Sequence, residues 1–380
     1  MSWLTDTLVT TGALIALVLL VRRPVSRHFG PGTAYALWGL PLLRLFLPPL
    51  VLPAAPVSAP VGEVVVLTDT STAAAAAPSL SFAWVEPLMI GLWLADMWIN
   101  AGREAPVHYV ELGPGRGTLA RDALRAARRY GLEPSIHLIE ASTALKDVQL
   151  ATVPGAIWHH DLSTIPAYGP VLVVANEFLD ALPVRQLVKT ADGWRERMVV
   201  PDGDRFVCVA GPQAMDPAVP EARRAAPEGT IYELCPGAAA TIYEVSGRLK
   251  DQGGAALFID YGHDAPRNGS TLQAVRAHLK VDPFVNPGDA DLTAHVDFAA
   301  LAPIAESRGV RWIGTVPQGR WLRELGIEAR AQALAAAAPE HAVAIQIAKD
   351  RLISEGQMGL LFKVMGLAAP GWPGGAGFSG

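Results

Sequence analysis

The sequence contains only two cysteines, Cys208 and Cys235, among its 380 residues. They form no CxxC pair, so neither a disulfide framework nor a cysteine-based zinc site is indicated, and a reducing compartment is the natural expectation. A His-Glu-x-x-His zinc motif is also absent, and the nine histidines show no clustered ligand spacing. We therefore expect no metal centre.

An excess of positive charge is lacking as well. The 31 Lys and Arg residues are outnumbered by 36 Asp and Glu, which gives a formal net charge of −5. General nucleic-acid-binding proteins are normally basic, so we expect no nucleic-acid partner. A chain of this length can hold two domains, or one large domain with additions.

Long apolar runs are concentrated at the N-terminus. Residues 3–21 form an almost uninterrupted run, close to the roughly 20 residues that cross a bilayer. A second run, at 35–52, contains Arg44 and three prolines and is a weaker span. Arginines at 22, 23 and 27 separate the two runs, and the positive-inside rule places them in the cytoplasm. We expect membrane association through residues 3–52.

Within residues 1–55, LVLLVRRPV (17–25) and LPLLRLFLPPL (40–50) resemble the N-terminal membrane segment of the beta-lactam-sensing membrane metallopeptidases. The zinc motif of that family is missing here, so the resemblance does not imply peptidase activity. Residues 56–80 are rich in Ala, Pro, Ser and Val and are typical of a linker.

The most informative stretch is HYVELGPGRGTLA, at 108–120. An apolar run ends in Glu111, glycines follow at alternate positions (Gly113, Gly115 and Gly117), and a helical pattern then begins. This order predicts a strand, a tight loop and a helix whose N-terminal N–H groups face a ligand.

Two cofactor classes use such a loop, and a glycine turn without any ligand is a third interpretation. Dinucleotide enzymes prefer Gly-x-Gly-x-x-Gly, whereas this chain has Gly-x-Gly-x-Gly preceded by an acid. A carboxylate at Glu111 would repel a pyrophosphate but suits the cationic amino-acid end of S-adenosylmethionine (SAM). We therefore expect SAM, with an NAD-linked oxidoreductase as the alternative.

Further acidic residues stand where predicted strands end. Glu140 ends the second strand, where an acid can accept hydrogen bonds from both ribose hydroxyls. Asp161 follows the third strand and either contacts the adenine amino group or caps a helix. Asn176, Glu177 and Asp180 follow the fourth strand. Glu177 and Asp180 could orient an amine or guanidinium nucleophile and take its proton, with capping of a helix by Asp180 as the alternative.

Strands alternating with helices predict a parallel sheet with crossover helices. The predicted strands are 107–112, 135–140, 156–159, 171–176 and 255–261. We place the main domain at 81–367, with a small antiparallel meander inserted at about 184–236. Residues 358–365 are predicted to form a strand at the sheet edge, and the Gly/Pro-rich tail at 368–380 to be disordered.

Seven motifs in order resemble one family, the class I SAM-dependent methyltransferases of the MidA and mitochondrial complex I assembly-factor group, over about residues 90–364. They are ELGPGRGTL (111–119), NEFLDALPVRQ (176–186), ALFIDYG (256–262), PG (287–288), ADLTAHVDF (290–298), QG (318–319) and MGLLFKV (358–364).

The resemblance implies a Rossmann-like α/β fold and, as in the mitochondrial members, methylation of an arginine in a core subunit of respiratory complex I. It implies that the glycine loop, Glu140 and Asp161 hold SAM, and that Asn176, Glu177 and Asp180 face the methyl acceptor. Residues on the acceptor side would be Asp260, Tyr261, Asp291, Thr293, His295 and Asp297.

The chain departs from this family before residue 90. Family members carry a longer N-terminal part that covers the cofactor, and here only Glu86 and its neighbours could preserve a remnant of it. We therefore expect weakened SAM binding, and a catalytically inactive, membrane-anchored scaffold is an alternative function. The sequence leaves a homodimer open.

The predicted membrane topology conflicts with the predicted SAM site. If both apolar runs crossed the membrane, the domain would be exported away from any SAM pool. A cytoplasmic catalytic domain requires that the second run is interfacial or re-entrant, or that the N-terminus is a fusion without function.

Overall fold

The computed structural model describes residues 85–203, 205–276 and 279–378. The membrane-like segment, the linker and the hydrophobic helices predicted before the main domain lie outside these residues. Among the described residues, no helix is both long enough and apolar enough to cross a membrane.

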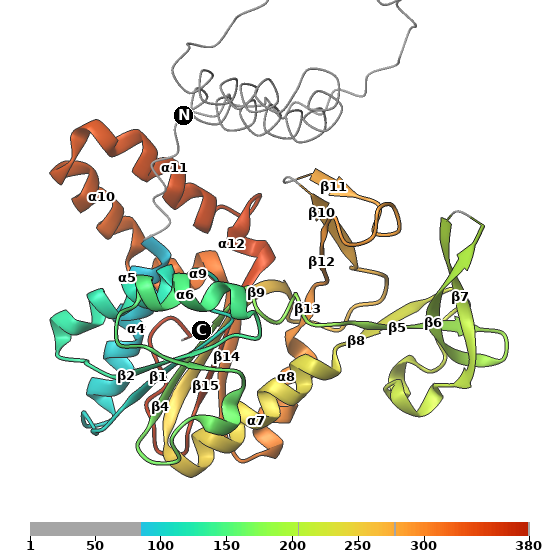
Figure 1. Cartoon of the computed structure of the whole chain (residues 1–380), viewed down its shortest axis with the longest axis horizontal. Coiled ribbons are helices and arrows are strands. Elements are labelled where there is room, and N and C mark those ends of the chain that lie inside the picture. The colour runs from blue at the N-terminus through green and yellow to red at the C-terminus, as the bar shows by residue number, and fades with distance from the viewer. Residues whose placement is uncertain (1–84, 204, 277–278, 379–380) are drawn as a thin grey trace, which may run out of the picture. The chain divides into compact units, whose positions relative to one another are not determined.

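The described chain is organised around a mostly parallel sheet with the strand order β14-β15-β9-β4-β1-β2-β3, and β13 pairs with β9 (Figure 1). Its strands are β1 (His108–Leu112), β2 (Ser135–Ile139), β3 (Ile157–His159), β4 (Val171–Asn176), β9 (Gly254–His263), β13 (Val296–Asp297), β14 (Arg311–Pro317) and β15 (Phe362–Ala368). In this sheet β15 runs antiparallel to both of its neighbours, β9 and β14, and the other strand pairs described for the sheet are parallel. The predicted α/β class with a largely parallel sheet is confirmed.

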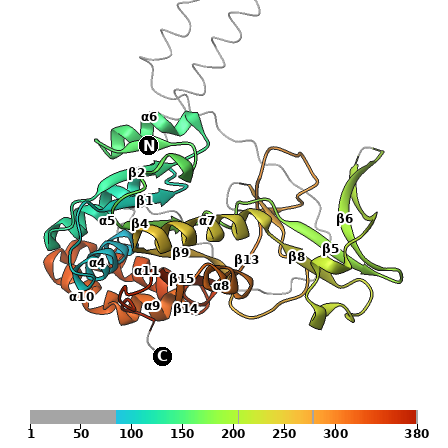
Figure 2. The ribbon, with the colours of Figure 1, turned by 90° about the horizontal axis from the view of Figure 1, so that it is seen from below.

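Helices flank this sheet (Figures 1 and 2). They are α4 (Val85–Asn100), α5 (Thr118–Ala127), α6 (Thr143–Thr152), α7 (Pro236–Gln252), α8 (Phe298–Ser307), α9 (Gln318–Glu324), α10 (Ile327–Ala337), α11 (Ala342–Ile353) and α12 (Met358–Leu361). Short 3-10 turns lie at Arg128–Tyr130, Leu162–Thr164, Asp216–Ala218, Glu221–Arg223 and Pro339–His341. Because helices cover the sheet, its central strands β1 and β4 are buried almost throughout, as expected for a parallel sheet.

Helices α4 and α5 cross at very close range. A Cβ atom at Gly91 of α4 would lie 2.1 Å from the carbonyl oxygen of Ala123 in α5. The missing side chain therefore allows the two backbones to touch, and it fixes α4 against the helix that begins at the glycine loop.

Two small antiparallel sheets lie apart from the central sheet, as both views show (Figures 1 and 2). The first has the order β7-β6-β5-β8 and corresponds to the predicted meander. Its strands are β5 (Arg185–Thr190), β6 (Gly193–Asp202), β7 (Arg205–Ala214) and β8 (Ile231–Leu234). Trp194 is fully buried in its separate small core. The second sheet has the order β11-β10-β12 and was not predicted; its strands are β10 (Gln273–Arg276), β11 (Leu279–Val281) and β12 (Asp291–Thr293).

The C-terminal region differs from the prediction in two ways. The segment predicted as a strand from residue 358 begins as helix α12, and its strand β15 lies inside the sheet, between β9 and β14, rather than at the edge. Strand β14 comes before β15 in the sequence but lies at the edge of the sheet. The chain then turns back through α9 to α12, and β15 runs antiparallel between β14 and β9. Local patterning carries no information on that order.

The tail predicted to be disordered instead packs on the core. Phe378 meets Trp93 edge-on, with ring centroids 6.4 Å apart. A Cβ atom at Gly375 would lie 2.8 Å from Nε1 of Trp93, and one at Gly377 would lie 2.4 Å from Cδ1 of Trp321. The glycines thus allow the backbone to lie directly against two buried indole rings, so a composition typical of disorder serves close packing here.

Three buried histidines form a hydrogen-bonded ladder across β1, β2 and β3. His108 Nδ1 lies 3.0 Å from His137 Nε2, and His137 Nδ1 lies 2.9 Å from His159 Nε2. One end is fixed, because His108 Nε2 faces the Tyr168 carbonyl at 2.9 Å and must donate to it. With all three rings neutral, each ring then donates through Nε2 and accepts through Nδ1, and the last Nδ1 accepts from the Thr164 hydroxyl at 2.7 Å. The ladder is satisfied with all three rings neutral, and an added proton reverses the hydrogen bonds between the charged ring and Thr164.

This ladder predicts a stability change with pH. Burial and the two neighbouring histidines lower the pKa of His137 to about 4, below its ordinary value of 6.5. Between these values the unfolded chain binds more protons, so the ladder's contribution is complete above about pH 6.5 and is lost as the pH falls towards 4. Allowing for solvent screening, we expect the loss to be about 1–2 kcal/mol.

Urea unfolding at several pH values measures this effect in the wild type and in His137→Gln, whose amide can still bond both neighbours. Buried carboxyls with raised pKa act in the opposite direction in both proteins, so the difference between the two is the relevant quantity. The wild type should lose more stability on acidification than the variant. Identical pH dependence would contradict the prediction.

Candidate functional site

The glycine loop joins β1 to α5 at the carboxyl end of the sheet. Gly113, Gly115 and Gly117 have φ values of +63°, +52° and +76°, a region that other residues rarely adopt. A Cβ atom at Gly113 would lie 2.8 Å from the Phe178 ring, whereas one at Gly115 would meet nothing within 4 Å. Gly113 therefore serves packing inside the protein, and Gly115 leaves open space against which a ligand can lie.

Glu111 is buried beneath this loop. Its carboxylate accepts a hydrogen bond from the Tyr109 hydroxyl at 2.8 Å and another from the Ala120 N–H. Burial raises the pKa of Glu111 to about 7, although both hydrogen bonds oppose that rise. The structure places this acid as a brace between β1 and the first turn of α5, and its contact with the cationic end of SAM stays a prediction.

The two acids predicted to bind the nucleoside follow neighbouring strands. Glu140 comes directly after β2, and its Oε1 accepts the Ser142 N–H at 2.9 Å. Asp161 follows β3, and its Oδ1 accepts both the N–H and the hydroxyl of Ser163. Asp161 therefore caps the 3-10 turn Leu162–Thr164, which was the alternative interpretation of this residue. The ribose and adenine contacts stay predictions.

The turn after β4 is held by Asp260 of β9. Oδ2 of Asp260 accepts the N–H groups of Phe178, Leu179 and Asp180 at 3.2, 2.9 and 3.1 Å. Oδ1 accepts the N–H of Tyr261 at 2.9 Å. Asp260, only 1% exposed, was predicted on the acceptor side. The structure places it under the turn, as the anchor that shapes this side.

Carboxyl groups gather at this turn. Burial raises the pKa of Glu177, nearby Asp180 raises it further, and Arg351 of α11 opposes them. Burial and then Glu177 raise the pKa of Glu86, in the first turn of α4, to about 7. Asp180 is 6% exposed, and burial raises its pKa too. Glu86 is thus poised to hold or accept a proton near neutral pH, and Glu177 and Asp180 hold a proton more readily than ordinary carboxyls do.

Two features suggest that this cluster is built for a ligand. Glu177 has φ +48°, a strained conformation for a residue with a side chain. The buried Oδ1 atom of Asn176, at the end of β4, has no hydrogen-bond partner among the described residues. Since buried polar atoms are normally paired, this acceptor is available to a bound donor.

The remaining acceptor-side residues are only partly brought together. The Tyr261 hydroxyl donates to Asp180 Oδ2, and the Tyr261 ring meets the His295 ring edge-on with centroids 5.6 Å apart. Asp297 instead caps α8 by accepting the Ala300 N–H at 3.1 Å. Asp291 is exposed on β12, so a role for it on the acceptor side stays a prediction.

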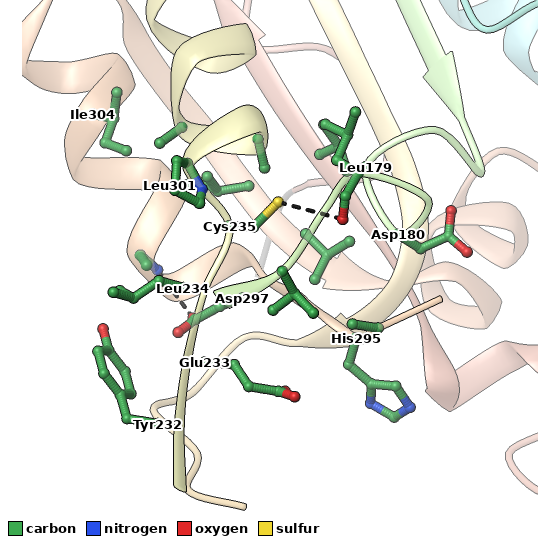
Figure 3. A pocket seen from close by; sticks show the side chains of 18 residues that line it. Leu179, Asp180, Tyr232, Glu233, Leu234, Cys235, His295, Asp297, Leu301 and Ile304 are labelled. Atoms are coloured by element: carbon green, nitrogen blue, oxygen red, sulfur yellow. Dashed lines mark hydrogen bonds between the residues drawn. The ribbon is translucent and has the colours of Figure 1, made fainter. Parts of the chain in front are cut away.

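A cavity of about 240 Å³ lies beside Asp180 (Figure 3). Most of its walls are apolar, and they come from the turn after β4, the end of β8 and helices α7 and α8. Asp180 and His295 lie on the same side of it (Figure 3). The residues lining it include Leu179, Leu182, Val184, Leu234, Cys235, Val296, Leu301 and Ile304. Its volume is below the roughly 300–1,000 Å³ of sites for drug-sized ligands, so it fits a side chain better than a separate molecule.

Over the described ranges, no three His, Cys, Asp or Glu side chains converge in a way that could hold a metal ion. The histidine ladder links rings end to end and does not point them at a common centre.

A family model described as a putative S-adenosyl-L-methionine-dependent methyltransferase matches residues 89–316. The chain belongs to this family. The match includes the glycine loop, the Asn176–Asp180 turn and Asp260, and it selects SAM over the dinucleotide alternative.

Relatives of this methyltransferase bear a more specific name. The protein arginine methyltransferase NDUFAF7, mitochondrial, of Xenopus tropicalis is 34% identical over 311 residues, covering 72% of this chain and 71% of that protein. The Homo sapiens protein of the same name is 33% identical over 313 residues, covering 73% and 70%. A likely methyltransferase from Burkholderia thailandensis, solved with bound S-adenosyl-homocysteine, superposes with a TM-score of 0.66 at 30% identity, covering 75% and 76%.

The residues present fit SAM. The open space over Gly115 accommodates a ligand against the backbone, and Glu140 and the unpartnered Asn176 Oδ1 offer acceptors on either side of the loop. Sequence reasoning located Gly115 by the spacing of the glycines and Glu140 and Asn176 by their positions at strand ends, and it assigned Asn176 to the methyl acceptor. It noted Glu86 only as a remnant and missed Gln149 of α6, whose amide reaches both the loop and Glu140. A lone glutamine within a helical pattern carries no signal of such a contact.

The two glycines Gly115 and Gly131 provide a matched test of the loop. Both have positive φ, and a Cβ atom at either would meet nothing within 4 Å. Replacing either by alanine should therefore cost a similar backbone strain, about 1–2 kcal/mol. Only Gly115→Ala should weaken binding of S-adenosylhomocysteine, by about tenfold or more in calorimetry, because its methyl group occupies the ligand's space. Equal affinities of the two variants would remove the loop from the cofactor site.

Proposed function

We propose that this methyltransferase transfers a methyl group to the guanidinium of an arginine in a protein substrate. The observation that carries the proposal is the Glu177–Asp180 acid pair at the end of β4, in which Asp180 is buried, the Glu177 side chain is open to solvent, and the pKa of each carboxyl is raised. A guanidinium needs carboxylates that orient it bidentately and take its proton. The name protein arginine methyltransferase, borne by relatives, supports the same substrate class.

Bound SAM would supply an electrophilic methyl group, and the electron pair of the broken carbon–sulfur bond would stay on the sulfur. The arginine nitrogen forms the new bond to the methyl carbon as the carbon–sulfur bond breaks, and S-adenosylhomocysteine remains. The proton lost from the guanidinium passes to the Glu177–Asp180 pair. Tyr261, which donates to Asp180 Oδ2, keeps that carboxylate in place, and the Asp260 anchor fixes the turn that carries both acids.

The apolar cavity beside Asp180 supports a protein acceptor over a free amino acid. It can receive an apolar side chain close in sequence to the acceptor arginine while the guanidinium enters the acid cluster. Such an anchor contributes binding energy away from the reacting atoms, which positions the acceptor. We infer that the first acceptors to test are core subunits of respiratory complex I.

Methyl transfer from tritiated SAM to purified complex I core subunits tests the proposal. Glu177→Gln and Asp180→Asn should each lower the rate by about 10²–10⁴-fold, because each loses a proton acceptor. Affinity for S-adenosylhomocysteine should stay within about threefold, since neither acid is assigned to the cofactor. Glu133→Gln, at an exposed acid away from the site, is the control.

The pH dependence has a definite sign. Both acids act in their ionised form, and burial raises the pKa of each, so the rate should rise with pH through their elevated pKa values and fall on acidification. Cofactor binding without any transfer to arginine would contradict the proposal and favour the catalytically inactive scaffold.

We also propose that residues 3–52 attach the catalytic domain to the cytoplasmic side of a membrane. The support is the apolar run at 3–21, followed by three arginines. Membrane fractionation of the full chain beside a variant without residues 1–60 measures this. The full chain should sediment with membranes and the shortened chain should not; equal distribution would contradict the proposal.

A further inference from the structure

Gln149 of α6 connects two parts of the cofactor site that come from different strands. Its Nε2 donates to the Gly115 carbonyl at 2.8 Å and to Oε2 of Glu140 at 3.3 Å. Both partners are acceptors without a proton to give, so the amide orientation follows from the chemistry. The side chain is 0% exposed.

Helix α6 also packs against the end of the loop. A Cβ atom at Gly117 would lie 3.2 Å from Val153, just beyond the helix, 3.5 Å from Thr152 Cβ and 3.6 Å from the Cα of Gln149. The helix therefore lies directly against the loop, and Gln149 is the member of this contact that also reaches Glu140.

The hydrogen bond from Gln149 holds the second oxygen of the Glu140 carboxylate. Oε1 of Glu140 is already held by the Ser142 N–H at 2.9 Å. With Gln149 on Oε2, both oxygens are tethered, so the plane of the carboxylate is set and its remaining lone pairs point in defined directions. Without Gln149 the group would be held at one oxygen and could rotate.

The side chain of Gln149 does not maximise the stability of the fold. Its Oε1 is buried and has no hydrogen-bond partner among the described residues. An unpaired buried amide oxygen is unfavourable, and an apolar side chain of similar length would avoid that cost. Residues that reduce stability in this way are characteristic of functional sites.

We propose that Gln149 is a positioning residue that sets the spacing between the glycine loop and Glu140 and so couples binding of the two halves of the cofactor. The proposal rests on the methyltransferase function proposed above and on the cofactor contacts predicted from the sequence, in which the loop region receives the amino-acid half of SAM and Glu140 the ribose. Gln149 acts through these two groups and need not touch the cofactor.

The test is a double-mutant cycle on S-adenosylhomocysteine binding, measured by calorimetry on the full chain. Gln149→Met keeps the length of the side chain and removes its donors. We expect it to raise the Kd about tenfold in the wild-type background. In the Glu140→Ala background the same substitution should raise the Kd less than about threefold, because the group that Gln149 positions has gone. Gln346→Met, at a glutamine that bonds only Asp350 among the described side chains, is the control and should leave the Kd unchanged.

Thermal unfolding of the same variants separates positioning from general support of the fold. The unfolding midpoint of Gln149→Met should stay close to that of the wild type, because the unpaired Oε1 is removed with the donors. A large drop in the midpoint that accompanies the loss of binding would overturn the proposal in favour of a structural role. Full additivity of the two substitutions, or unchanged binding by Gln149→Met, would also overturn it while leaving the cofactor site intact. Failure of the folded wild type to bind S-adenosylhomocysteine would instead overturn the proposed cofactor site, and this inference with it.

Discussion

The site depends above all on the Asp260 carboxylate, which gathers four backbone N–H groups from the turn after β4 and from its own strand. This single side chain ties β9 to the neighbouring strand at the edge where ligands bind in parallel sheets. It also allows Glu177 to hold an unfavourable positive φ, since the surrounding bonds fix the turn. The chemistry assigned to Glu177 and Asp180 thus follows from a buried acid that need not meet the substrate.

The groups around that turn reveal a balance between stability and function. Glu86, Glu111, Glu177 and Asp180 are carboxyls whose pKa burial raises, which is an unfavourable arrangement for a folded chain on its own. Asn176 and Gln149 each leave a buried oxygen unpaired. Away from the site the histidine ladder pairs every ring nitrogen, whereas Trp93 and Trp321, under the glycine-rich tail, each leave a buried Nε1 unpaired among the described residues. The raised pKa values of Glu177 and Asp180 and the unpaired oxygen of Asn176 thus lie together beside the turn that Asp260 holds.

Sequence reasoning located the strand ends well. Strands that are buried on both faces, such as β4, appear in the sequence as continuous apolar runs, and an acid or amide follows where each run ends. It could not place β15, whose position inside the sheet depends on a return of the chain through β14. It mistook the tail for disorder because glycine and proline serve both flexible linkers and tight packing over rings. Residues such as Gln149 leave no local signature, since their role depends on two partners from other elements.

The sequence by itself determined the fold class, the glycine loop, the family and thereby the cofactor, because these depend on local spacing and on motifs in order. Tertiary structure decided the role of each acid. Asp161 caps a short turn, Glu111 braces a helix and Asp260 anchors a loop, which leaves Glu177 and Asp180 as the pair proposed to take the proton. Three of these five acids, Glu111, Asp161 and Glu177, lie within two residues of a strand end and look alike in the sequence. Their functions diverge because a carboxylate's chemistry is set by the donors it meets and the water it loses, and both are known only once distant segments have packed together.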